Sequence, residues 1–213
     1  SMDAIPDRLK PHWDRKVTKR CVMTIPYNAK PFSNRSYIRD AFKEKGVDVD
    51  KEELTQCVKA VRSAMNKVVP GAMSVMKWIE QEIARAIKAG ADEITWTTPS
   101  GFNVRQRLMK YKSTIIQTQL MGRCEIHLAG AETGVDLSHH KNATAPNLIH
   151  SLDASLLHLA TTSTNFPIAL IHDSVLCRAT DMCTLSSLVR KTYMHLFAEH
   201  EPLTDFALAI GAE

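Results

Sequence analysis

The chain has 213 residues, of which 44% are hydrophobic, and a formal net charge of +4. It is therefore long enough to bury a core, and so modest a charge does not by itself diagnose nucleic-acid binding. No stretch approaches the roughly eighteen apolar residues of a membrane span, so we expect no membrane partner. Five cysteines without a Cys-x-x-Cys pair favour reduced thiols, and the histidines lack the His-Glu-x-x-His spacing of zinc hydrolases.

The residue pattern predicts an α+β protein with two portions, the first of them helical. Ser1-Met2 has the character of an expression scar, and residues 3–90 are expected to be mostly helix. Helical apolar spacing, interrupted near Gly46 and Pro70, places helices at 7–25, 33–45, 50–68 and 70–89.

Residues 91–213 form the second portion, in which short and alternating apolar runs predict antiparallel strands. Strands are expected at 94–98, 102–111 and 114–128, then a polar loop at 129–145, a helix at 147–162, strands at 168–171 and 175–177, and a helix at 182–198. Four cations alternate along the expected hairpin and could contact a nucleic-acid backbone or simply face solvent: Arg105, Arg107, Lys110 and Lys112.

A cationic stripe opens the helical portion. Arg15, Lys19, Met23 and Tyr27 recur every four residues, so on a helix each is offset by only about 40° from the one before it. Such stripes are usually apolar and face the core. Two cations at its start instead favour a face turned towards a polyphosphate, with a solvated basic helix face as the alternative.

An aspartate near the end of the chain complements this stripe. His172-Asp173-Ser174 lies between two short apolar runs, which predicts two buried strands joined by a tight turn. A carboxylate at a rigid hairpin tip suits Mg²⁺, which uses few protein carboxylates and shares its other positions with water and phosphates. An ordinary hairpin turn is the alternative.

Together these elements resemble two motifs of the single-subunit, bacteriophage-type DNA-directed RNA polymerases, a family that includes mitochondrial enzymes. The pattern Arg-x-x-x-Lys-x-x-x-Met-Thr-x-x-Tyr opens the fingers of that family, and His-Asp-Ser is its palm hairpin. Two intervening blocks agree in order: Thr98-Pro99-Ser100-Gly101-Phe102, and residues 145–153, which contain Pro146, Asn147, His150, Ser151 and Asp153. The resemblance runs from about residue 11 to about residue 206 and implies an incomplete right-hand polymerase fold, with fingers at 3–90 and palm at 91–213.

The resemblance also implies roles for the residues of the stripe. Arg15 and Lys19 would hold the triphosphate of the incoming NTP, and Lys19 would protonate or neutralise the leaving pyrophosphate as a catalytic residue. Met23 would pack beside the nascent base pair. Tyr27 would lie by the sugar and favour ribonucleotides through their 2′-OH.

In the second portion the resemblance implies that Asp173 is the catalytic metal ligand for Mg²⁺. His150 would bind at the minor-groove edge of the newest base pair or its 2′-OH. The implied partners are a DNA template, nascent RNA and NTPs, with a monomeric parent in the cytoplasm of an infected host cell, or alternatively in a mitochondrion or plastid. A related DNA polymerase, or a nucleic-acid-binding domain that has lost the chemistry, are the other interpretations.

Two residues at the end of the stripe bear on its geometry. Asn28 stands where the family usually has glycine, and Asn tolerates left-handed backbone better than most residues, so we expect the turn to survive. Pro26 should end or kink the helix just before Tyr27, which would let the tyrosine point away from the line of Arg15 and Lys19.

Only one of the two carboxylates that two-metal nucleotidyl transfer requires can be assigned. Upstream of Arg15 there are only Asp3, Asp7 and Asp14, and no strand-like apolar run precedes them. We therefore expect a C-terminal part of a larger polymerase that is inactive by itself. Charge is distributed accordingly, with 11 Lys or Arg against 5 Asp or Glu in residues 1–45 and 4 against 7 in residues 141–213.

Overall fold

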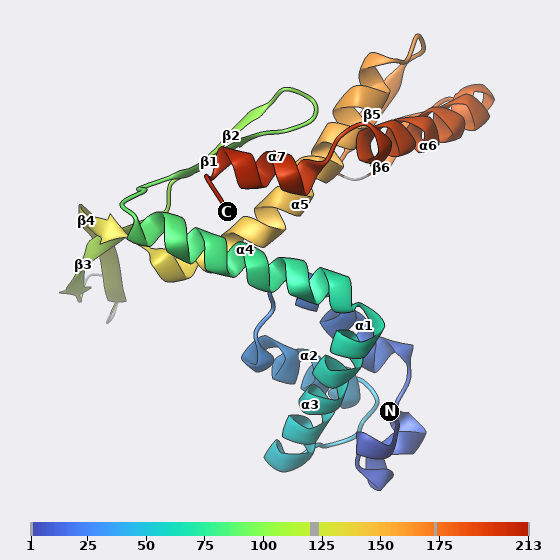
Figure 1. The fold of residues 1–213 in the computed structure, drawn as a ribbon. Coiled ribbons are helices and arrows are strands. Elements are labelled where there is room, and N and C mark those ends of the chain that lie inside the picture. Colours follow the sequence, from blue (N-terminus) through green and yellow to red (C-terminus); the bar gives the residue numbers. More distant parts are fainter. Residues whose placement is uncertain (1, 120–123, 173, 213) are drawn as a thin grey trace. The chain divides into compact units, whose positions relative to one another are not determined.

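A computed structural model describes residues 2–119, 124–172 and 174–212 (Figure 1). The chain forms two compact units, Ser1–Glu80 and Gln81–Glu213, here called the N-terminal and C-terminal units. The division falls within helix α4 (Pro70–Lys88). The expected boundary between fingers and palm at residues 90 and 91 stays a prediction, because compactness does not test which role each portion performs.

The N-terminal unit is helical, as expected, but the helix predicted at 7–25 is divided. A 3-10 helix at Asp7–His12 is followed by extended backbone at Trp13 and Asp14, and only then does α1 begin. The Asp14 carboxylate accepts hydrogen bonds from the backbone N–H groups of Lys16 and Val17, at 2.8 and 3.2 Å. An N-cap residue takes extended geometry to do this, which is why the helix cannot run through it. The helices are α1 Arg15–Thr24, a 3-10 turn Ile25–Tyr27, α2 Pro31–Lys43, α3 Lys51–Val68 and the first part of α4.

The N-terminal unit has one apolar core, built from α1, α2, α3 and the 3-10 segments that precede α1. Its buried residues include Leu9, Val17, Cys21, Ile25, Ile38, Phe42, Cys57, Val58 and Val61. Arg8 links the 3-10 helix Asp7–His12 to α3, since its guanidinium donates to both carboxylate oxygens of Glu53. Glu53 also completes a capping box with Asp50, so one carboxylate serves the helix start and the tertiary contact.

The C-terminal unit mixes helices with three separate two-stranded antiparallel sheets, which agrees with the predicted α+β class. The paired strands are β1 Ile94–Thr97 with β2 Asn103–Gln106, β3 Met109–Thr118 with β4 Cys124–Val135, and β5 Ile168–Ile171 with β6 Ser174–Cys177. The helices are the end of α4, α5 Leu137–Thr162, α6 Met182–Ala198 and α7 Pro202–Ala209.

Several local predictions for this unit were wrong. The two strands expected at 102–111 and 114–128 are three, since β2 ends at Gln106, β3 runs from Met109 to Thr118 and β4 begins at Cys124. No loop occupies residues 129–145, since β4 continues to Val135 and α5 begins at Leu137. Asp136 starts the helix by accepting a hydrogen bond from the backbone N–H of His139, a cap that the polar composition of the segment concealed. The helix expected at 147–162 therefore begins at Leu137 instead, and Pro146 lies inside it.

The β1–β2 hairpin packs against α5 and α7 (Figure 1). The Trp96 ring meets Phe206 of α7 edge to face, with centroids 5.6 Å apart, and its indole N–H donates to the Ser151 hydroxyl of α5 at 3.1 Å. Leu148 and Leu152 of α5 are also buried. The hairpin and the two helices therefore share a buried aromatic and aliphatic contact.

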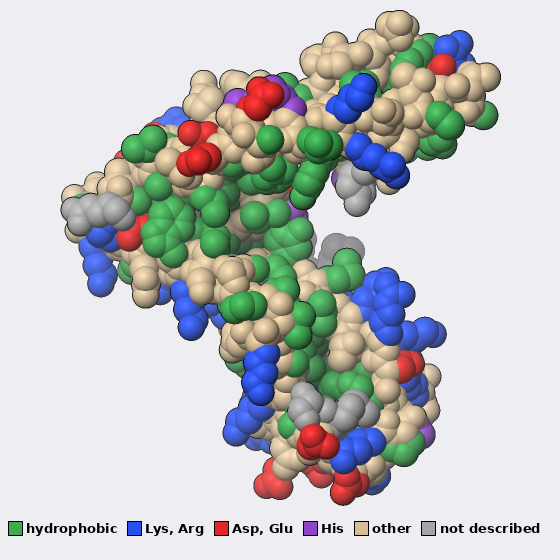
Figure 2. Space-filling view, turned by 45° about the vertical axis from the view of Figure 1, so that its right-hand side comes forward, with side chains coloured by type: hydrophobic (Ala, Val, Ile, Leu, Met, Phe, Trp, Pro, Cys, Tyr) green, Lys and Arg blue, Asp and Glu red, His purple; other side chains and the backbone are tan. Residues whose placement is uncertain are grey.

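The strands β5 and β6 were expected to be buried, and this was wrong. Leu170, Ile171 and Leu176 are 42, 58 and 54% exposed, because the two strands pair with each other in a sheet of their own. An apolar run shows that a segment is suited to burial, but not that a covering element is present. Figure 2 shows other apolar side chains, in green, lying at the surface of the molecule.

Candidate functional site

Helix α1 carries two stripes with the same spacing on opposite faces. Val17, Cys21 and Ile25 are at most 1% exposed and belong to the core. The Arg15, Lys19 and Met23 stripe is exposed, and it is offset from the core stripe by two residues, or about 200° around the helix. The cationic stripe therefore lies on the exposed face of α1, and the apolar stripe with the same four-residue spacing lies on the buried face.

Arg15 and Lys19 have no side-chain hydrogen bond or ion pair with any residue that the structure describes. The neighbouring carboxylate, Asp14, is occupied at the cap and by Lys45, whose Nζ lies 2.7 Å from it. The Lys45 ammonium holds the pKa of Asp14 below its usual value. Two adjacent turns of α1 therefore present cations that no described carboxylate neutralises.

The end of the stripe has the geometry that Pro26 and Asn28 predicted. Helix α1 ends at Thr24, and Pro26 lies in the 3-10 turn that contains Tyr27. Asn28 has a φ of 65° and a ψ of 27°, so the left-handed turn is kept without glycine. Tyr27 is 38% exposed beside it.

The Thr98-Pro99-Ser100-Gly101-Phe102 block forms the turn of the β1–β2 hairpin. The backbone N–H of Thr98 donates to the Phe102 carbonyl, and Gly101, with a φ of 81°, donates to the Thr98 carbonyl. The Ser100 hydroxyl donates to Ser155 of α5 at 3.2 Å. The backbone hydrogen bonds hold the turn in shape, and the Ser100 hydrogen bond attaches it to α5, the helix that carries His150.

Helix α5 holds the second intervening block. His150 and Asp153 are exposed, whereas Leu148 and Leu152 beside them are buried. His150 directly precedes Ser151, which accepts the Trp96 hydrogen bond, so the packing of the hairpin determines which way this part of the helix faces.

A buried polar network lies at the start of α5, and the sequence analysis missed it. His140 and Thr144 are fully buried and Gln106 is 5% exposed. The backbone N–H of Leu108 donates to His140 Nε2 at 3.1 Å, and the Gln106 amide lies 3.2 Å from Nδ1. Asn147 reaches the other end of the Gln106 amide at 2.7 Å. Burial, followed by the neighbouring charge of His139, lowers the pKa of His140, so the ring is neutral near pH 7.

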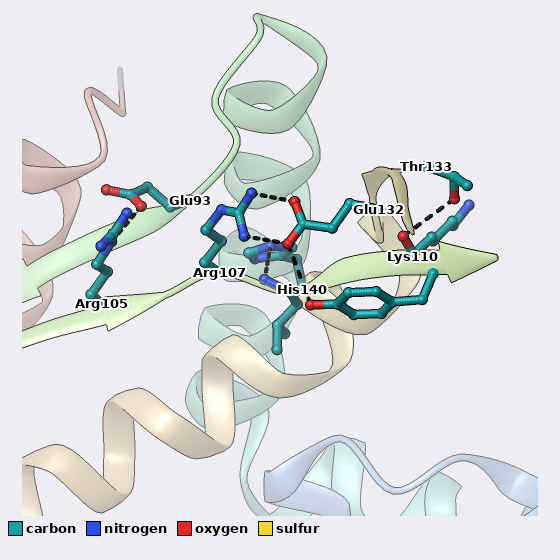
Figure 3. Close-up of polar contacts among 9 residues, drawn as sticks. Glu93, Arg105, Arg107, Lys110, Glu132, Thr133 and His140 are labelled. Carbon is teal, nitrogen blue, oxygen red and sulfur yellow. Dashed lines mark hydrogen bonds and ion pairs between the residues drawn. The ribbon is translucent and has the colours of Figure 1, made fainter. Parts of the chain in front are cut away.

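The alternating cations of the strands prove to be partly neutralised, as Figure 3 shows. Arg105 pairs with Glu93, and Arg107 forms two parallel hydrogen bonds with the Glu132 carboxylate, at 2.8 and 2.6 Å. This pairing depresses the pKa of Glu132. These pairs join β2 to the segment before β1, and the connection after β2 to β4, which favours the solvent-facing alternative for these two residues.

The metal-binding prediction rests on Asp173, which lies outside the described residues. Ile171 pairs with Ser174, and His172, directly after Ile171, has a left-handed φ of 54°. Among the described residues, no three His, Cys, Asp or Glu side chains gather as metal ligands. An imidazole and a hydroxyl at the tip are poor ligands for Mg²⁺, so binding there depends on the Asp173 carboxylate.

The described cysteines Cys21, Cys57, Cys177 and Cys183 are free, and burial raises the pKa of the first two thiols to about 11. No helix of the described chain has both the length and the apolar character needed to cross a bilayer.

Comparison with known proteins identifies the family. The family described as DNA-dependent RNA polymerase matches residues 2–210. DNA-directed RNA polymerase 2A of Nicotiana tabacum is 31% identical over 192 residues, which cover 86% of this chain and 56% of the relative. DNA-directed RNA polymerase 1, mitochondrial, of Nicotiana sylvestris is 30% identical, and the match covers 19% of it. DNA-directed RNA polymerase of Pseudomonas phage phiKMV is 26% identical over 214 residues, covering 94% of this chain and 26% of the relative.

The chain spans about half the length of the first of these relatives and about a fifth to a quarter of the other two. The matched residues 2–210 include all four sequence blocks, two of which lie on the exposed face of α1 and at the turn of the β1–β2 hairpin. The chain belongs to the family of single-subunit DNA-dependent RNA polymerases found in phages and organelles.

Proposed function

We propose that this chain acts as part of a DNA-directed RNA polymerase that transfers nucleotidyl groups from NTPs to a growing RNA on a DNA template. The observation that carries the proposal is the exposed stripe of Arg15, Lys19 and Met23 on α1, opposite a fully buried stripe. A polymerase needs fixed cations facing the cleft to bind triphosphate, and these two cations have no described partner that would neutralise them.

In this proposal each part of the chain has a defined task. Arg15 and Lys19 bind the triphosphate, and Lys19 stabilises the charge that develops on the leaving pyrophosphate. Tyr27 lies by the sugar and His150 by the newest base pair. Asp173 holds Mg²⁺, whose chemistry would be to neutralise charge on the phosphates and orient the attacking oxygen.

The chain is proposed to supply one of the two carboxylates that the chemistry requires. Asp7 pairs with Lys10, and Asp14 is used as a cap and by Lys45, so neither is placed as a metal ligand. We therefore propose a monomeric polymerase in which another segment contributes the second carboxylate, working in the cytoplasm of an infected host cell or in an organelle.

The test is primer–template extension by the polymerase that contains this chain. Lys19→Ala should lower kcat/KM for NTPs by about 100-fold or more, because it removes charge stabilisation at the leaving group. Lys59→Ala, an exposed cation on α3, is the matched control and should change little. Asp173→Ala should abolish extension while template binding remains. Equal losses for Lys19→Ala and Lys59→Ala, or extension with dNTPs in preference to NTPs, would contradict the proposal.

A further inference from the structure

The turn that follows α1 is held by more contacts than its backbone needs. Asn28 has left-handed geometry, its N–H donates to the Ile25 carbonyl at 2.9 Å, and the Ala29 N–H donates to the Thr24 carbonyl at 3.1 Å. These bonds end the helix in the manner of a left-handed C-cap. Glycine would satisfy the same φ without a side chain, so the backbone alone does not explain an asparagine here.

The Asn28 side chain is tied to α4. Its Nδ2 donates to Oε1 of Glu80 at 2.7 Å, and its Oδ1 accepts from Nζ of Lys30 at 2.7 Å. Lys30 closes the ring by binding the same Glu80 oxygen at 2.9 Å. The Glu80 side chain is 27% exposed, so this charge-assisted set is partly protected from water.

A second helix fixes the next residue of the turn. Nη1 of Arg62, on α3, donates to the Ala29 carbonyl at 2.9 Å and to Oδ1 of the fully buried Asn34 at 3.0 Å. The turn is thus held at Asn28 by the carboxylate of Glu80 from α4, and at Ala29 by the guanidinium of Arg62 from α3. We call these two contacts, Glu80 on Asn28 and Arg62 on Ala29, the clamp. Tyr27 directly precedes the clamp and is 38% exposed.

We propose that Glu80 is a positioning residue for Tyr27: acting through Asn28 and Lys30, it holds the turn that presents the tyrosine to the sugar of the incoming nucleotide. This inference rests on the proposed function, because it assigns the clamp to the selection of ribose by that polymerase. Glu80 itself does not need to touch the nucleotide.

The experiment measures the ratio of kcat/KM for NTP over dNTP in primer–template extension by the polymerase that contains this chain. Asn28→Gly keeps the left-handed backbone and removes the amide, and Glu80→Ala removes the acid. Each should lower the ratio by about 3- to 10-fold, the range a charge-assisted hydrogen bond allows. The double variant should be no worse than the worse single variant, because both remove the same clamp. Glu82→Gln, whose carboxylate pairs with Arg85 on α4, is the matched control and should leave the ratio unchanged.

Epistasis with Tyr27 separates positioning from general loss of stability. In a Tyr27→Phe background, Asn28→Gly should have no further effect on the ratio. A full additional effect there, or an unchanged ratio in both Asn28→Gly and Glu80→Ala, overturns the positioning role and leaves the proposed function standing. An unchanged ratio in Tyr27→Phe alone overturns both.

Amide exchange at residues 27–29 of the 213-residue chain gives a readout that does not depend on activity. The exchange should become faster in Asn28→Gly and Glu80→Ala and stay the same in Glu82→Gln. Equal exchange rates in all three variants would also overturn the positioning role.

Discussion

At the scale of single residues, one polar side chain often determines where an element begins. Asp14 caps α1 and binds Lys45, so it sets both the start of the helix and its attachment to the segment after α2. The start of α1 in turn sets which residues fall on the exposed face. The position of Arg15 and Lys19 on that face therefore depends on the Asp14 cap.

Replacing Asp14 by alanine should lower the free energy of unfolding of the N-terminal unit by about 1 kcal/mol, the usual cost of losing an N-cap. Denaturant unfolding checks this. Asp14→Asn is the matched control, because it keeps a capping oxygen and loses only the ion pair with Lys45. A loss in Asp14→Asn as large as in Asp14→Ala would show that the ion pair, rather than the cap, matters.

His140 gives the C-terminal unit a specific sensitivity to acid. Its folded pKa lies below the usual value of about 6.5 because the ring is fully buried, so the unfolded chain binds the proton first. Its stabilising effect is complete above about pH 6.5 and is lost as the pH falls below that value towards the lowered folded pKa.

The loss should have a slope of at most about 1.4 kcal/mol per pH unit, which corresponds to one proton. His140→Gln keeps an acceptor for the Leu108 N–H and cannot titrate, so it should flatten the pH dependence of unfolding as the pH falls below about 6.5. His158→Gln is the control, because His158 is an exposed histidine elsewhere on α5. The same slope in His140→Gln and in the unchanged protein would contradict the assignment.

At the scale of elements, the β1–β2 hairpin depends on its turn. Gly101 has a φ of 81°, a region that residues with a Cβ adopt at a cost, although there is open space around a Cβ added there. The strain therefore comes from the backbone alone. The turn also presents Ser100 to α5, so its geometry affects how the hairpin is attached.

Gly101→Ala should lower the free energy of unfolding of the C-terminal unit by about 1–2 kcal/mol, measured in denaturant. Gly71→Ala is the comparison: Gly71 is a helical glycine of the N-terminal unit with open space around it, and alanine there should leave the stability of that unit unchanged or raise it by about 1 kcal/mol at most. A destabilisation of the same size in both variants would show that the left-handed conformation is not the cause.

At the scale of the whole molecule, each compact unit contains a tryptophan against a phenylalanine. Trp13 lies 6.0 Å from Phe42 in the N-terminal unit, and Trp96 lies 5.6 Å from Phe206 in the C-terminal unit. With Trp78 of α4 replaced by phenylalanine, each remaining indole can be removed in turn, so that fluorescence follows one unit at a time.

The acid effect of His140 should then be seen by Trp96 and not by Trp13, because the two indoles belong to different compact units. Unfolding is measured in denaturant at several pH values with each single-tryptophan protein. Identical pH dependence from the two reporters would show that the units unfold as one, which would contradict this prediction.

Local features of the chain were predictable because neighbouring residues determine them. The helices of the N-terminal unit from α2 to α4, the helical break before Tyr27, the left-handed turn at Asn28 and the glycine turn of the β1–β2 hairpin follow from spacing and backbone preference. Caps were the exception. Asp14 and Asp136 start helices that composition placed several residues away, since any polar segment contains residues able to cap.

The sequence by itself determined the family, the four blocks that carry it, and the cationic spacing of Arg15 and Lys19. Only the tertiary structure decided which face of α1 is buried, since the apolar and cationic stripes have the same period. It also decided that Arg107 is paired with Glu132, that His140 is buried and neutral, and that Asn28 is clamped to Glu80. These outcomes depend on contacts between residues far apart in the chain, and the spacing of residues within one segment carries no information about them.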